Sequence, residues 1–136
     1  MAVLKTNNMP LKVGQTLSVT GIPDADATTR FAVNIGPDDK DIALHVNPRF
    51  KANVHEHTVV FNTRQGGTWG QEVLGEGFPF QQGVEFTITI AFNPEEFVVT
   101  FSDGSVIHFP NRLGAKEYTY FFADGEVRIV SLDIKQ

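Results

Sequence analysis

Three polar residues at alternate positions, His45, Asn47 and Arg49, form the first group in the sequence that could recognise a ligand. In a β-strand, residues at i, i+2 and i+4 project from the same face. A neutral imidazole offers one hydrogen-bond donor and one acceptor, an amide offers both, and a guanidinium offers a rigid fork of donors. This combination suits a ligand that carries many hydroxyl groups. The same spacing also fits a strand face that is merely solvated.

Further polar and aromatic residues follow on the neighbouring segments. Asn62 ends the next apolar alternation, and Trp69 and Glu72 come after a Gly-rich turn. A Trp at a turn exit can expose its ring and stack on the apolar face of a sugar, whereas the alternative for a lone Trp is burial in the core. Pro48 lacks an N–H group, so it predicts that the first polar run lies on an edge strand or an irregular one.

Two other kinds of chemistry are open to the same region. His55 and His57 would share a strand face and, with His45, could ligate zinc if the strands bring them together, but solvated loop histidines are the alternative. Glycoside hydrolysis needs two carboxyl groups about 5 to 10 Å apart. The acid that follows Glu72 most closely is Glu76, in a Gly-rich turn. We therefore expect neither a metal site nor a catalytic residue.

The elements that must position these side chains are short strands. Apolar residues alternate with polar ones in runs that recur roughly every ten residues. The clearest run is Phe86–Phe92, and Asp103-Gly104 between two later runs is a hairpin signal. The pattern predicts about ten or eleven strands in an all-β sandwich or barrel, with no helix beyond a turn or two. The length of 136 residues predicts one domain, residues 1–136.

Composition and charge narrow the range of partners and compartments. The net charge is −5, from 11 basic and 16 acidic residues, and no run of Lys or Arg breaks the mixture. Nucleic acid and anionic membranes are therefore not expected as partners. No segment approaches the ~18 apolar residues of a membrane span, and the first residues lack the apolar core of a signal peptide. The chain has no Cys, which excludes disulfides and thiolate chemistry, and a cytoplasmic location is the expectation.

Several separated motifs together resemble the carbohydrate signature of the galectins. They stand in the family's order and with its gaps, and the similarity runs from about Leu4 to Ile134. The motifs are His45-x-Asn47-Pro48-Arg49, Val59-Val60-Phe61-Asn62, Trp69-Gly70-x-Glu72, Phe78-Pro79-Phe80 and Phe109-Pro110-Asn111-Arg112.

This resemblance implies a two-sheet antiparallel β-sandwich, a jelly-roll of the concanavalin-like type. It implies a lectin that binds β-galactosides such as lactose and N-acetyllactosamine, with no cofactor and no catalysis. His45, Asn47 and Arg49 would bind the axial 4-hydroxyl of galactose, and Trp69 would stack on the galactose ring. A site that pairs an axial hydroxyl rejects the equatorial epimer, because its polar groups would be left unpaired. Galactose would thus be preferred over glucose.

The second part of the implied site departs from the family. Asn62 and Glu72 would hold the 6-hydroxyl region and the neighbouring sugar. Galectins generally carry an Arg two residues after this Glu, and here that position is Leu74. We therefore expect Glu72 to be held by Arg49 alone and disaccharides to bind more weakly. The alternative is a galectin-like structural protein that has lost sugar binding.

Contacts beyond the first sugar fall in a variable loop. Residues 53–57 stand where many galectins have His-Gly-Asp, and Arg30, Asn53 and His55 are candidates for an extended subsite. The resemblance also implies a homodimer that joins terminal strands around Val3–Thr6 and Val127–Ile134 and crosslinks glycans of glycoproteins and glycolipids. Such proteins reside in the cytosol and are also exported without a signal peptide.

Overall fold

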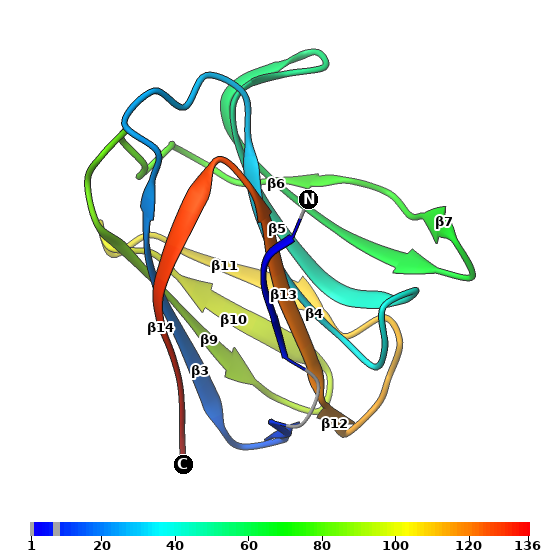
Figure 1. Cartoon of the computed structure of the whole chain (residues 1–136). Helices are drawn as coiled ribbons and strands as arrows, with labels where there is room; N and C mark the ends of the chain where they lie inside the picture. The colour runs from blue at the N-terminus through cyan, green and yellow to red at the C-terminus, as the bar shows by residue number, and fades with distance from the viewer. Residues whose placement is uncertain (1, 7–8) are drawn as a thin grey trace.

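The computed structural model describes residues 2–6 and 9–136 and arranges them in two antiparallel sheets that pack face to face (Figure 1). The seven-stranded sheet contains, in spatial order, β1 (Ala2–Thr6), β13 (Tyr120–Gly125), β4 (Phe31–Gly36), β5 (Ile42–Ala52), β6 (His55–Gln65) and β7 (Thr68–Trp69), with β8 (Val73–Leu74) also paired to β6. The five-stranded sheet contains β11 (Val106–Pro110), β10 (Glu96–Thr100), β9 (Phe86–Phe92), β3 (Thr16–Pro23) and β14 (Val127–Lys135). A small third pairing joins β12 (Glu117–Tyr118) to β2 (Leu11–Lys12).

The predicted all-β sandwich is confirmed, although the strands are more numerous than expected. The described residues form 14 strands and no helix, against the ten or eleven strands that the sequence predicts. Four of these strands have only two residues, too few for an alternating pattern to show. No helix in the described part of the chain could span a membrane.

The core lies between the two sheets and is built largely from Phe. Burial alternates along β9, so that Phe86, Ile88, Ile90 and Phe92 point inward, as their spacing predicts. Phe31 of the opposite sheet stacks on Phe86 with the ring centroids 5.3 Å apart. This interleaving fixes the seven-stranded sheet on its partner and leaves the outer face of that sheet free to carry polar side chains.

Strand β5 occupies the middle of the seven-stranded sheet, so of the two alternatives predicted for Pro48, an edge strand or an irregular one, the structure shows the irregular one. β5 pairs with β4 on one side and with β6 on the other. The ladder with β4 stops at the pair of Val33 and Val46, and an isolated bridge between Arg30 and Arg49 follows. Pro48 therefore lies in a gap of the ladder with β4, where a residue that lacks an N–H group can be accommodated.

Candidate functional site

A cleft of about 530 Å³ opens on the seven-stranded sheet and gathers the side chains predicted to form the site. The side chains come mainly from β5, β6 and β7. The lining residues are Arg30, His45, Asn47, Arg49, Asn53, Val60, Asn62, Trp69, Gly70 and Glu72. They include all six residues predicted to contact sugar and two of the three candidates for an extended subsite. The third candidate, His55, contacts Glu72 at the rim.

The polar stripe of β5 is packed rather than merely solvated. His45, Asn47 and Arg49 are only 9%, 2% and 8% exposed, while the alternate residues Leu44 and Val46 belong to the core. Asn47 donates through Nδ2 to the Phe31 carbonyl over 2.7 Å, and its Oδ1 accepts from Arg49 Nε over 2.9 Å. Burial at this depth requires polar groups to be paired. One Asn47 N–H and several Arg49 N–H groups remain for a ligand.

The proton position on His45 follows from its neighbour on β4. Asn34 Nδ2 donates to the Phe122 carbonyl over 3.3 Å, which turns Asn34 Oδ1 toward His45 Nδ1, 2.5 Å away. An amide oxygen only accepts, so Nδ1 of His45 carries the proton and Nε2 is an acceptor. Burial, aided by the positive charge of Arg30, lowers the pKa of His45 to about 3, so the ring is neutral at pH 7.

Asn62 of β6 is positioned by a residue to which the sequence assigned no role. Its Nδ2 donates to the Gly70 carbonyl over 3.0 Å, while its Oδ1 accepts from the Thr63 backbone and from Arg112 Nη1 over 3.2 Å. Arg112 also donates to the Gln71 carbonyl over 3.0 Å and so ties the segment after β7 to β6. With its oxygen occupied twice, Asn62 offers a ligand one N–H donor.

Trp69 lies on β7 at the end of the cleft with its ring accessible. The side chain is 44% exposed, which excludes the alternative that it belongs to the core. Its ring centroid lies 4.6 Å from that of His45, and the Arg64 guanidinium lies 6.0 Å from it. An indole held in this way offers an apolar surface beside the hydrogen-bonding atoms of β5.

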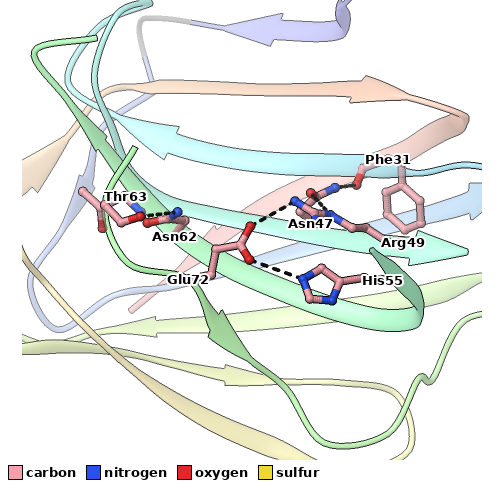
Figure 2. A network of polar contacts seen from close by, with 8 residues as sticks. Phe31, Asn47, Arg49, His55, Asn62, Thr63 and Glu72 are labelled. Carbon is pink, nitrogen blue, oxygen red and sulfur yellow. Dashed lines mark hydrogen bonds and ion pairs between the residues drawn. The ribbon is translucent and has the colours of Figure 1, made fainter. Parts of the chain in front are cut away.

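The prediction that Arg49 alone holds Glu72 is wrong. Arg49 Nη2 lies 3.4 Å from Glu72 Oε2, and His55 Nε2 lies 3.3 Å from Glu72 Oε1, so each carboxylate oxygen has its own partner (Figure 2). The resemblance to galectins places a second partner at position 74, which is Leu in this sequence. In the structure, the second partner comes from the start of β6 instead.

The other candidates have different surroundings. Arg30 Nη2 lies 2.8 Å from Asp124 Oδ1, so its charge at the end of the cleft is already paired. Asn53 sits in the turn between β5 and β6 with φ of 56°. His57 packs its ring edge-on against Phe78 at 5.4 Å, away from the contact between His55 and Glu72. Among residues 2–6 and 9–136, no three His, Cys, Asp or Glu side chains gather as a metal site would require.

Comparison with known proteins decides the family. Residues 2–134 match the sequence profile of the galactoside-binding lectin family. The chain belongs to this family, the galectins. It is 50% identical over 127 residues to the beta-galactoside-binding lectin of Electrophorus electricus, covering 93% of each chain. The crystal structure of Dario rerio galectin-1-L2 shares 51% identity with the chain and superposes on it with a TM-score of 0.93, covering 97% of this chain and 99% of that one.

The galectin fold extends to more distant members. Congerin II, crystallised with lactose and MES, is 30% identical to the chain, covers 97% of it and 98% of its own length, and has a TM-score of 0.92. The predicted jelly-roll sandwich is therefore confirmed by structures that share the fold from end to end.

Proposed function

We propose that this galectin binds β-galactosides, with the terminal galactose seated in the cleft on β5, β6 and β7. The proposal rests on the hydrogen-bonding atoms of β5 that have no partner among the residues that the structure describes. Together they offer one acceptor and two donors, the set that a single hydroxyl group needs. A hydroxyl has one O–H donor and two acceptor lone pairs. His45 Nε2 is an acceptor, and Asn47 and Arg49 each keep an N–H donor beside it. A 4-hydroxyl placed among these three residues would have all its hydrogen-bonding positions filled.

The remaining lining supports the orientation of the sugar. Galactose has an apolar face formed by its ring C–H groups, and the exposed ring of Trp69 offers a surface on which that face can stack. Asn62 supplies a donor, and the Glu72 carboxylate supplies an acceptor on the side toward a second sugar. An equatorial 4-hydroxyl would leave the buried β5 groups unpaired, which is the basis for preferring galactose over glucose.

Binding without catalysis is part of the proposal. Hydrolysis of a glycoside requires an acid and a second carboxylate across the scissile bond. Among the residues that line the cleft, Glu72 is the single carboxylate, and it is engaged by Arg49 and His55. Prolonged incubation with lactose should therefore release no monosaccharide, and the appearance of glucose would contradict this part of the proposal.

Retention on lactose-agarose tests the function. The wild-type protein should be retained and released by free lactose but not by sucrose. Trp69→Ala and Arg49→Ala should pass through the column. The first substitution removes the ring on which the sugar stacks, and the second removes donors to its 4-hydroxyl. Lys116→Ala, which removes an exposed cation between β11 and β12, outside the cleft and outside β1 and β14, is the control and should be retained. A wild-type protein that is folded and passes through the column would refute the proposal and favour a structural role.

We also propose that two copies pair through β1 and β14 and so present two sugar sites. These strands end their respective sheets, and an unpaired strand edge is where another chain can continue a sheet. Light scattering at micromolar concentration should give twice the monomer mass of 15.0 kDa. A monomeric mass would exclude the dimer without affecting the sugar site.

A further inference from the structure

The Glu72 carboxylate lies between two cationic or protonatable side chains from neighbouring strands. Arg49 of β5 approaches one of its oxygens and His55 of β6 approaches the other (Figure 2). The Glu72 side chain is 43% exposed, whereas those of Arg49 and His55 are 10% and 18% exposed. The carboxylate is thus the most exposed of the three side chains, and the two less exposed residues can fix its orientation.

Leu74 cannot contribute to this arrangement. It is 51% exposed on β8, where it pairs with Val60, and its side chain has no donor. Glu72 itself lies in the connection between β7 and β8, outside any strand. A carboxylate on such a segment loses conformational freedom when it binds a ligand, unless neighbouring donors already hold it.

We propose that His55 is a positioning residue that holds Glu72 beside Arg49 in place of an Arg at position 74, and that its protonation raises affinity for galactose-containing disaccharides. The inference rests on the proposed function, because Glu72 faces the side of the cleft toward the second sugar. A neutral imidazole can donate one N–H to a carboxylate. A protonated imidazole makes the same contact as a charge-assisted hydrogen bond, which is stronger.

The charged groups around His55 are consistent with a protonated imidazole that strengthens its contact with Glu72. Glu72 faces it from the segment between β7 and β8, and Arg49 faces the other oxygen of that carboxylate from β5. Lys51 of β5 pairs in register with Glu56, and Glu56 Oε2 also lies 3.9 Å from His57 Nδ1. The carboxylate in contact with the His55 ring is therefore that of Glu72. His45 does not respond in the same pH range, because its pKa is lowered to about 3.

The test measures lactose affinity by calorimetry as a function of pH. Imidazole is the side chain whose charge ordinarily responds between about pH 5 and 8, so lactose is titrated at about pH 8 and at about pH 5.5. Wild-type affinity should rise about twofold to threefold at the lower pH, the range expected for a partly exposed ion pair. His55→Ala should bind lactose about twofold to fivefold more weakly at the lower pH and should lose the pH dependence. Glu72→Gln should also lose it.

A second His–Glu pair provides the matched control. His108 Nδ1 lies 2.9 Å from Glu96 Oε2 on the five-stranded sheet, outside the cleft. His108→Ala should keep both the affinity and the pH dependence of the wild-type protein. Methyl β-galactoside, which lacks the second sugar, should lose less affinity than lactose in His55→Ala. An equal loss for both ligands would show that His55 does not act through Glu72.

The outcomes separate this inference from the proposed function. If the wild-type protein binds lactose at neither pH, the proposed function fails. If it binds lactose with the same affinity at both pH values, or if His55→Ala retains the wild-type pH dependence, the role of His55 is refuted and β-galactoside binding stands. Unfolding midpoints measured on each variant identify any loss that comes from damage to the fold.

Discussion

Asn34 on β4 and His45 on β5 are joined by a side-chain hydrogen bond between Oδ1 and Nδ1 over 2.5 Å, and both residues are buried. The bond gives His45 a single tautomer, with a bare Nε2 that faces the cleft. A residue that touches no ligand thereby decides whether a ligand hydroxyl meets an acceptor or a donor.

The first prediction concerns this bond. Asn34→Ala should weaken lactose binding about threefold to tenfold, because His45 can then protonate Nε2 instead of Nδ1 and lose its acceptor. The unfolding free energy should fall by about 1 to 3 kcal/mol, since the Phe122 carbonyl loses its side-chain donor. Calorimetry on protein shown to be folded by circular dichroism checks the result. Unchanged lactose affinity would mean that the tautomer is fixed by something other than Asn34.

The second prediction follows from the lowered pKa of His45. The unfolded chain binds a proton near the ordinary value of 6.5, but the folded protein resists it down to about 3. Unfolding therefore takes up a proton in this window, and the unfolding free energy falls as the pH falls, by at most about 1.4 kcal/mol per pH unit from this residue. His45→Gln should show a shallower decline between about pH 6 and about pH 4 in urea titrations. A slope in His45→Gln equal to that of the wild-type protein would contradict this prediction.

Trp69 provides a direct optical readout, because it is the single Trp of the sequence and its ring is 44% exposed. Covering the indole with a sugar removes water from it, so lactose should move the emission maximum to shorter wavelength. Sucrose at the same concentration should leave the spectrum unchanged. A spectrum that is insensitive to saturating lactose would place the ligand away from this ring.

The fourth prediction concerns Arg112. It contacts no sugar in the proposed site, but it donates hydrogen bonds to Asn62 Oδ1 and to the Gln71 carbonyl. Arg112→Ala should weaken lactose binding about twofold to fivefold by freeing the Asn62 amide to turn. Arg128→Ala, which removes an exposed Arg from the other sheet, should leave the affinity unaltered. Equal affinities of the two variants would show that Asn62 needs no support from Arg112.

The strands and the polar stripe could be predicted because they depend on spacing alone. The two-residue period of Phe86–Phe92 places one face in the core, and the same period places His45, Asn47 and Arg49 on one face of β5. Pro48 predicted an edge strand or an irregular one and could not decide between them, because the pairing of a strand with its neighbours is not encoded in that strand alone. Sequence cannot show that the β4 ladder is interrupted beside Pro48.

The supporting contacts could not be predicted because they join residues far apart in sequence. His55 and Glu72 are 17 residues apart, and Arg112 and Asn62 are 50 apart. Asn34 did give a signal, as a polar residue inside the apolar run Phe31–Ile35, and a buried polar group needs a partner. Its partner, His45, follows only from the register of β4 and β5, in which the two residues lie opposite each other.

A crystal structure of the protein with lactose would show which side chains the galactose contacts. We expect galactose in the cleft on β5, β6 and β7, with its apolar face on Trp69 and its 4-hydroxyl within hydrogen-bonding distance of His45 Nε2 and Arg49. Lactose bound at another surface, or a 4-hydroxyl turned away from β5, would contradict this expectation.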